Sequence, residues 1–513
     1  MLSTMKFRFP SVITFANSFR AITRCDYRNA STLPITGRKP WSHSMNDLYR
    51  RISPAGDPTV SMFPILDKWA LEGRPIDKEQ LQVIIKELRY YKRYSHALQL
   101  SMWMSEKRFF KLASRDVAIR LDLIAKVHGI EKAENYFNNV PVQLRVLEVY
   151  GALLNCYTSV KSVEKSEATM QKMRDLGFAE TSLAYNVMLN LYYQTGNREK
   201  FDVLVNEMEE KGIGLDKYSV GIRLSAHSAV SDIQGIDKIL ERIESDPMFL
   251  LDWTVYAVAA NGYLKAGLPD RALAMLRKSE GMINGKKRGK AYVFLITQYA
   301  ATGKKDEVLR LWKLYKKKEK VYNMGYMSVI PSILKFGDFE TAEKIFDEWE
   351  SRNLTYDLRI PNALIGAYSR KGLMEKAETT INNVISKGKE PDAIMWYYMA
   401  TGYLQINQPA KAVEPIKKAL LVCQSWWKPR KIFFATCLKY LKDEGNVKAA
   451  EEIIGLLGRK DIVSMEVHDR LLKYIRDEEM DLDALRALND EELAENGEVH
   501  GLLEVVKDSS NCT

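Results

Sequence analysis

Three stretches of the chain repeat one pattern at spacings close to multiples of 35 residues. They read YNVMLNLYYQTGNREKF (residues 185–201), YAVAANGYLKAGLPDRA (residues 256–272) and NALIGAYSRKGLMEKA (residues 362–377). Each begins with an apolar run of helical period that contains an aromatic residue, passes through a glycine suited to end a helix, and starts a second, charged run. A repeated unit of this length is typical of stacked helical arrays, so it decides the fold.

Two markers carry the register of this unit along the chain. The residue five positions after the glycine is usually small or apolar; the series is Ala97, Ala133, Ser166, Phe201, Ile236, Ala272, Val308, Ala342, Ala377, Ala412 and Ala450. The residue four positions before the glycine is usually aromatic; the series is Tyr157, Tyr192, His227, Tyr263, Tyr299, Ile333, Tyr368 and Tyr403. Both series keep a period near 35 residues, and we expect the tyrosines to pack between helices rather than to stack on bases.

Each unit is predicted to be a pair of antiparallel helices. The glycines at the turn can adopt the left-handed conformation that ends a helix without a Cβ clash; they are Gly196, Gly267, Gly303, Gly337, Gly372 and Gly445. Pro269 can begin the following helix, where its missing N–H would have no partner anyway. One pair cannot bury its own apolar face, but stacked neighbours can. The predicted fold class is therefore all-α, a right-handed α-solenoid of about eleven two-helix repeats.

Composition adds few constraints. The 513 residues are 46% hydrophobic and 28% charged, and no stretch approaches the ~20 apolar residues of a membrane-spanning helix. The net charge is +10, but residues 1–45 hold seven basic residues and only one acid, Asp26, so the remainder carries a mild excess of about +4. The charge therefore permits a polyanionic partner without requiring one. We expect no membrane insertion.

The amino-terminal segment has the composition of an organelle-import peptide. It is rich in Arg, Ser and Thr and nearly free of acids, and its apolar residues lie between bases. A disordered basic tail remains the alternative, and a plastid is the alternative to the mitochondrion. The predicted organisation is a mitochondrial transit peptide (1–45), a linker and N-terminal cap (46–76), the repeat array (77–475) and an acidic C-terminal cap or tail (476–513). Five scattered cysteines indicate buried thiols rather than disulfides.

The repeat resembles the pentatricopeptide repeat. In the 181–216 unit, Tyr185 and Asn186 open the first helix, Gly196 marks the turn and Asp216 closes the unit. The 358–392 unit matches equally well, whereas 393–429 is similar to a tetratricopeptide unit. Uniform units near 35 residues resemble the P subfamily, which comprises mainly plant organelle proteins. The resemblance implies a non-enzymatic protein that binds single-stranded RNA.

The resemblance also implies which residues face RNA bases, namely the fifth and the last residue of each repeat. The fifth residues are Gln82, Ala118, Gly151, Asn186, Gly221, Ala257, Val293, Met327, Asn362, Tyr397 and Ala435. Asn186 with Asp216, and Asn362 with Asp392, resemble the combination that the family uses for uracil. The alternative is that these residues only cap helices. Gly221 with Asp252 and Met327 with Asp357 keep the closing acid but lack the amide. With only two competent repeats, we expect limited sequence readout.

A basic stretch offers candidate phosphate contacts. Its leading members are Lys286, Lys287, Arg288, Lys304 and Lys305, although lysines on an outer helix often form only a solvated face. The acidic residues after 476 are expected to solvate the end of the array or to contact a partner.

No motif for catalysis, a metal or a cofactor occurs in the sequence, and the six histidines are dispersed. We therefore expect no enzyme activity and no cofactor. Three functions remain open. The first is binding of organellar RNA in RNA maturation, stability or translation. The second is a structural or assembly role with mitochondrial ribosome proteins, and the third is a protein–protein scaffold.

Overall fold

The structure is a computed structural model of the chain. It describes residues 43–54, 57, 60–73, 77–107, 110–246, 249, 252–283, 288–352, 354–424, 427, 429–476 and 485. Most of the predicted transit peptide and acidic tail therefore lies outside the described residues, and so do Lys286 and Lys287.

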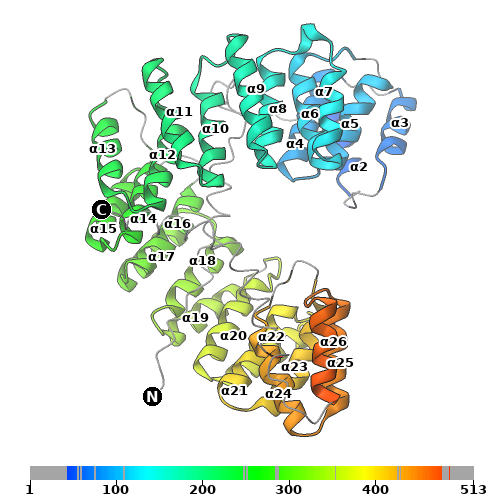
Figure 1. Ribbon diagram of the computed structural model, residues 1–513, viewed down its shortest axis with the longest axis vertical. Coiled ribbons are helices and arrows are strands. Elements are labelled where there is room, and N and C mark those ends of the chain that lie inside the picture. Colours follow the sequence, from blue (N-terminus) through cyan, green and yellow to red (C-terminus); the bar gives the residue numbers. More distant parts are fainter. Residues whose placement is uncertain are drawn as a thin grey trace. The chain divides into compact units, whose positions relative to one another are not determined.

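In the described part of the chain, all regular secondary structure is helical (Figure 1). Its elements are α2 (His43–Ile52), α3 (Phe63–Leu71), α4 (Lys78–Tyr90), α5 (Tyr94–Glu106), α6 (Ser114–His128), α7 (Ile130–Asn138), the 3₁₀ turn η1 (Val142–Leu144), α8 (Leu147–Ser159), α9 (Val163–Asp175), α10 (Ser182–Thr195), α11 (Arg198–Glu210), α12 (Lys217–Ala229), α13 (Ile233–Glu244), α14 (Trp253–Lys265), α15 (Pro269–Gly281), α16 (Arg288–Ala301), α17 (Lys305–Lys318), α18 (Asn323–Leu334), α19 (Phe339–Glu350), α20 (Arg359–Lys371), α21 (Met374–Ser386), α22 (Ala393–Gln405), α23 (Pro409–Val422), α24 (Ile432–Asp443), α25 (Val447–Arg459) and α26 (Met465–Arg476).

Each even-numbered helix from α4 to α24 packs against the odd-numbered helix that follows it, which gives eleven helix pairs. The prediction of an all-α solenoid of about eleven two-helix repeats is confirmed. The chain divides into two compact units, residues 1–251 and 252–513. Within each unit the even-numbered helices also pack on one another, α8 on α10 and α10 on α12 in the first, and α14 through α22 in sequence in the second. Equivalent residues of successive even-numbered helices therefore form rows.

Glycine ends the first helix of several pairs, as the sequence predicts. Gly196 ends α10 and Gly372 ends α20, each with a φ of 71° in the left-handed region. The next N–H then turns back onto the helix, so that Asn197 N donates to the Tyr192 carbonyl at 2.9 Å. Satisfying the last carbonyls in this way lets the second helix begin within two residues.

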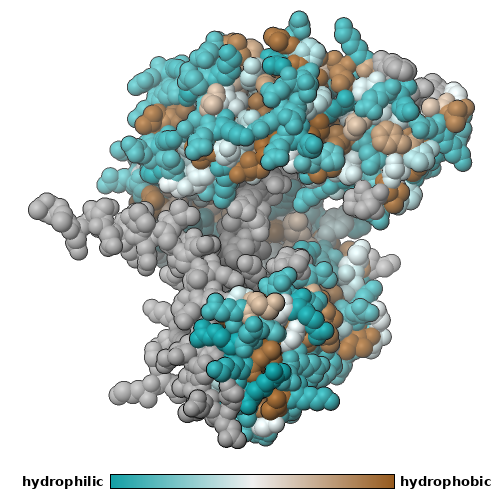
Figure 2. All heavy atoms as spheres, turned by 45° about the vertical axis from the view of Figure 1, so that its right-hand side comes forward, coloured by the Kyte–Doolittle hydropathy of each residue, from teal (hydrophilic) through white to brown (hydrophobic). Residues whose placement is uncertain are grey.

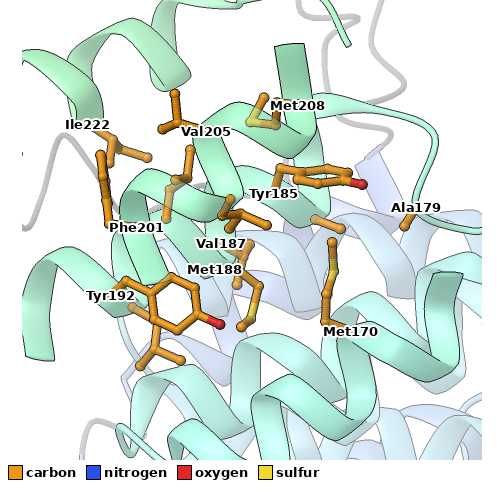
Figure 3. Packing of buried hydrophobic residues seen from close by; sticks show 14 of the residues in the cluster. Met170, Ala179, Tyr185, Val187, Met188, Tyr192, Phe201, Val205, Met208 and Ile222 are labelled. Carbon is orange, nitrogen blue, oxygen red and sulfur yellow. The ribbon is translucent and has the colours of Figure 1, made fainter. Parts of the chain in front are cut away.

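The repeats are held by apolar contacts within and between pairs. Figure 3 shows one cluster, in which side chains from α9, α10, α11 and α12 meet. Tyr185 and Met188 of α10 lie between Met170 of α9 and Met208 of α11, and Ile222 of α12 packs on the same cluster. Since burial of each large side chain contributes about 1.5–3 kcal/mol, a repeat is stable only when both neighbours cover it.

The marker tyrosines lie between repeats. The Tyr192 hydroxyl donates to Glu167 Oε1 on the preceding second helix at 2.9 Å, and Lys200 Nζ is 2.6 Å from the same oxygen. Tyr368 and Lys376 contact Glu343 in the same way, at 2.6 and 2.7 Å. The prediction that these tyrosines serve inter-helix packing is confirmed, and each also fixes a carboxylate that links adjacent repeats.

Because these carboxylates link adjacent repeats, we expect the free energy of unfolding of the array to depend on pH. Burial raises the pKa of Glu343, but the hydrogen bonds from Lys376 and Tyr368 outweigh it, so the net pKa is below the ordinary 4.5. The stabilisation is thus present above pH 4.5 and is lost as the pH falls through the lowered pKa.

We expect Glu343→Gln to destabilise the second unit by roughly 1 kcal/mol at pH 7 and to flatten its stability profile below pH 4.5. Thermal unfolding between pH 3 and pH 7 measures both effects. Glu340→Gln is the control, because Glu340 on the same helix is mostly exposed and, among the described residues, forms its ion pair with Lys344 alone. Equal profiles for the two variants would contradict the prediction.

The surface of the described residues carries both hydrophilic and hydrophobic side chains. Figure 2 shows, on the face it displays, small groups of hydrophobic residues scattered over a mainly hydrophilic surface. Among the described residues, none of the helices combines the length and the apolarity that crossing a membrane requires. Cys156, Cys423 and Cys437 are buried free thiols, as expected for these three; Cys25 and Cys512 lie outside the described residues.

Candidate nucleic-acid interface

The first predicted base-reading pair is formed in the structure. Asn186 lies on α10 and Asp216 lies directly before α12, and Asn186 Nδ2 is 3.1 and 3.0 Å from the two carboxylate oxygens. Asp216 also accepts hydrogen bonds from the backbone N–H groups of Tyr218 and Ser219, at 2.8 and 2.7 Å. The aspartate therefore caps α12 and holds the asparagine at the same time.

The second pair repeats this arrangement in the other unit. Asn362 Nδ2 on α20 donates to Asp392 Oδ2 at 2.9 Å, and Asp392 caps α22 by accepting from Met395 N at 2.9 Å. A carboxylate can only accept hydrogen bonds, so it orients the amide with its nitrogen inward. The capping interpretation is thus correct for both aspartates, but it does not account for the asparagines.

The amide oxygens of the two asparagines are unsatisfied. Asn186 is 1% exposed and Asn362 is 5% exposed, and neither Oδ1 atom has a hydrogen-bond partner in the described part of the chain. A buried acceptor without a donor costs about 1–3 kcal/mol. Each site can therefore gain from a ligand that donates an N–H to this oxygen, and the edge of a nucleobase carries such a group.

The two repeats that keep the closing acid but lack the asparagine are arranged differently. Asp357 accepts from Arg359 N at 3.1 Å and pairs with the Arg359 guanidinium at 2.6 Å, which lowers the pKa of the carboxyl. Arg359 stands where the 182–216 unit has Leu183. The fifth residue of the repeat that Asp357 closes is Met327, which has no amide, and the Arg359 guanidinium pairs with the Asp357 carboxylate instead. Asp252 accepts from Thr254 N at 2.9 Å as the cap of α14.

Two of the five predicted phosphate contacts are engaged within the protein. Arg288 Nε is 2.7 Å from Glu319 Oε1, and Lys305 Nζ is 2.6 Å from Asp338 Oδ2. The hydrogen bond from Lys305 holds the pKa of Asp338 at about 2. Lys304 is exposed. Arg288 and Lys305 thus link helices of the array, and phosphate binding by either would compete with an existing ion pair.

Three other cations stand out in the second unit, and the sequence interpretation missed them. Lys265, Lys335 and Arg370 lie at the carboxyl ends of α14, α18 and α20, each two residues before the glycine of the turn. All three side chains are exposed, and no acid pairs with them among the residues that the structure describes. Partial desolvation by surrounding protein atoms lowers the pKa of each cation.

Three exposed cations with no acid partner among the described residues suit a polyanion. The three positions lie on the layer of even-numbered helices, which also carries Asn362. Arg370 follows Asn362 by eight residues on α20, about 12 Å along the helix. In the sequence, the three cations share one position of the repeat, two residues before the glycine. A Lys or Arg is common at such a helix end, so this position alone does not indicate a binding site.

The described residues contain no group of three or more His, Cys, Asp or Glu side chains placed to hold a metal ion. His227, in one of the tyrosine positions, pairs with Asp232, its Nδ1 lying 2.8 Å from Oδ2. This pair joins α12 to α13 and accounts for the histidine.

Comparison with known proteins identifies the family to which this chain is similar. The family model described as PPR repeat matches residues 148–178, 183–213 and 360–388, which include both Asn–Asp repeats in part. A mitochondrial pentatricopeptide repeat-containing protein of Arabidopsis thaliana is 43% identical over 425 residues, covering 83% of this chain and 86% of the relative.

Two further matches are informative. The large ribosomal subunit protein mL101 of Arabidopsis thaliana is 34% identical over 444 residues, covering 86% of this chain and 90% of the relative. The crystal structure of the pentatricopeptide repeat protein PPR10 in complex with an 18-nt psaJ RNA element superimposes with a TM-score of 0.51 at 17% identity. That match covers 84% of this chain and 64% of PPR10, and it supports the fold alone.

Proposed function

Because the chain belongs to the pentatricopeptide repeat family, we propose that it binds single-stranded RNA in the mitochondrion and catalyses no reaction itself. The observation that carries this proposal is the pair of buried asparagines, Asn186 and Asn362, whose orphaned amide oxygens are held in position by Asp216 and Asp392. The mitochondrial assignment is supported by the relative named as mitochondrial and by the basic, acid-poor composition of residues 1–45.

The proposed binding mode separates two kinds of contact. Each asparagine offers an unpartnered acceptor that complements an N–H donor on a base edge; such contacts contribute about 1–3 kcal/mol of discrimination each, by analogy with DNA readout. Lys265, Lys335 and Arg370 supply contacts to phosphates, which add affinity without sequence preference. Two base-reading repeats specify few positions, so the proposed role combines modest selectivity with backbone binding, in RNA maturation, stability or translation.

The test is crosslinking of the full-length tagged protein to RNA in intact mitochondria, followed by sequencing of the protected fragments. We expect short footprints on one or a few transcripts, and roughly a tenfold or larger loss of footprint recovery for Asn186→Ala/Asn362→Ala. The control is Asn206→Ala/Asn382→Ala, because these exposed asparagines lie on the second helices of the same two repeats. Recovery of no RNA with the wild-type protein would overturn the proposal.

The 34% identity to mL101 favours a second candidate, a structural place in the mitochondrial ribosome. This role would give crosslinks confined to ribosomal RNA that are indifferent to the two asparagines. The protein would then sediment with ribosomal particles in a sucrose gradient, whereas a transcript-specific factor would remain in lighter fractions after ribosomes are dissociated.

A further inference from the structure

Arg120 is a buried cation of the first unit, and no carboxylate pairs with it among the described residues. It lies on α6 and is 8% exposed. Its Nε donates to Ser101 Oγ at 3.0 Å and its Nη2 to Ser105 Oγ at 2.8 Å. Nη2 also donates to the Ser101 carbonyl. All of these acceptors on α5 are neutral, whereas a buried guanidinium is normally paired with an acid, because taking a charge out of water is costly.

Two ionisable side chains near Arg120 do not supply the missing negative charge. Asp116, four residues earlier on α6, lies 2.8 Å from Lys78 Nζ and also accepts from the backbone N–H of Ala113. Tyr136 on α7 stays neutral, because burial raises its pKa by more than the nearby guanidinium lowers it. In the part of the chain that the structure describes, the charge of Arg120 is therefore balanced by no ion pair.

The array contains a second arginine at the same position of the repeat, and that arginine has an acid. Arg120 and Arg223 each lie two residues after the fifth residue of their repeat. In the other repeats this position is apolar and buried; its residues are Ile84, Leu153, Met188, Ala259, Leu295, Val329, Leu364, Met399 and Cys437. Arg223 pairs with Glu209 on the preceding second helix, its Nη2 lying 3.0 Å from Oε1. An arginine at this position is thus matched by a carboxylate in one repeat only.

Ser105 occupies the position of that glutamate. Glu209 lies eight residues after Phe201, the marker residue of its second helix. Ser105 lies eight residues after Ala97, the corresponding marker of α5. The side chains at both positions contact the arginine of the following first helix. A phosphoryl group on Ser105 supplies the negative charge and the acceptor oxygens that Glu209 provides in its own repeat.

We propose that Ser105 is a phosphorylation site and that its phosphate pairs with Arg120, which fastens the first repeat to the second. The donor is ATP: a serine/threonine protein kinase transfers the γ-phosphoryl group to Ser105 Oγ, the bond to ADP breaks, and the hydroxyl proton passes to the kinase's base. Ser105 is half-buried in the last turn of α5, which ends at Glu106, and such helix ends open locally, so a kinase gains access to the hydroxyl. Pairing with the buried guanidinium outweighs the unfavourable placement of an anion at a helix carboxyl end.

Mass spectrometry of the full-length protein, purified with phosphatase inhibitors from the cells that express it, tests for the modification. Trypsin releases residues 94–107, which contain Ser95, Ser101 and Ser105. Fragment ions are expected to place a phosphate on Ser105 and none on Ser101, which is 1% exposed. Complete coverage of this peptide without a phosphate on Ser105 would overturn the proposal.

Ser105→Glu tests the pairing, because it installs the residue that accompanies Arg223. In the full-length protein, amide hydrogen exchange in α5 and α6 is expected to slow roughly tenfold, since a charge-assisted pair then joins the two helices. The slowing is expected to vanish when Ser105→Glu/Arg120→Met is compared with Arg120→Met. The Arg120→Met background is expected to fold, because the 182–216 unit carries Met188 at this position.

Ser386→Glu is the matched control. Ser386 ends the second helix α21, and its hydroxyl donates to the Asn383 carbonyl at 2.9 Å, as that of Ser105 donates to the Met102 carbonyl at 3.1 Å. No guanidinium is hydrogen-bonded to Ser386 among the described residues, so exchange in α21 is expected to stay unchanged or to quicken. Slowing by Ser105→Glu that persists without Arg120, or no slowing at all, would refute the pairing.

Discussion

Simultaneous replacement of Lys265, Lys335 and Arg370 by glutamine is expected to weaken RNA binding about 50-fold near 0.15 M salt. Each phosphate contact on single-stranded nucleic acid releases counterions with a slope of about 0.7 in log K against log salt, so the slope is expected to fall by about 2. Fluorescence anisotropy with a labelled RNA, titrated at several salt concentrations, measures both quantities. Base preferences are expected to remain unchanged.

The matched control carries the same change in charge. Arg288, Lys304 and Lys305 replaced by glutamine remove three cations from the same unit, but Arg288 and Lys305 already pair with Glu319 and Asp338. We expect less than a threefold effect and a nearly unchanged salt slope. Because cations near helix carboxyl ends also stabilise the helix dipole, thermal unfolding of both variants is measured alongside. If the salt slope falls more in this control than in the Lys265/Lys335/Arg370 variant, the phosphate contacts belong to Arg288, Lys304 and Lys305 instead.

Phe201→Ala is expected to destabilise the first unit by roughly 3–5 kcal/mol, the usual cost of removing a buried phenylalanine. Phe201 on α11 is 2% exposed and belongs to the cluster of α9 to α12 (Figure 3). Most repeats have alanine at this position. Here a phenylalanine fills the space between the helices, so its removal leaves a large cavity. In an array each repeat stabilises the next, and the loss is expected to loosen α9 to α12 together.

Urea denaturation and limited proteolysis test this expectation. Val203→Ala on the same helix is the control, since Val203 is 63% exposed and its truncation is expected to change the free energy of unfolding by less than about 0.5 kcal/mol. Cleavage of the variant is expected first in the loops around α11. Equal urea midpoints for the two variants would mean that the cluster does not hold these repeats together.

The sequence by itself determined the repeat, the helix pairs and their number. These follow from local chemistry: an apolar period of 3.6 residues, a glycine able to adopt a positive φ and an aromatic residue recur in each unit, and every unit needs the same neighbour. The resemblance of the repeat to a known family also identified Asn186 with Asp216 and Asn362 with Asp392, and the structure brings the two residues of each pair into hydrogen-bond contact.

Only the tertiary structure decided which polar groups are already engaged. Arg288 and Lys305 meet acids on adjacent helices, whereas Lys265 meets none among the described residues, and charge alone cannot distinguish these cases because the partners lie about one repeat away. Asp116 accepts from the Ala113 N–H and so caps α6, from a position that no fixed spacing indicates. Helix periodicity is encoded in consecutive residues, but the pairing of side chains across a helix interface depends on packing distances of a few ångströms.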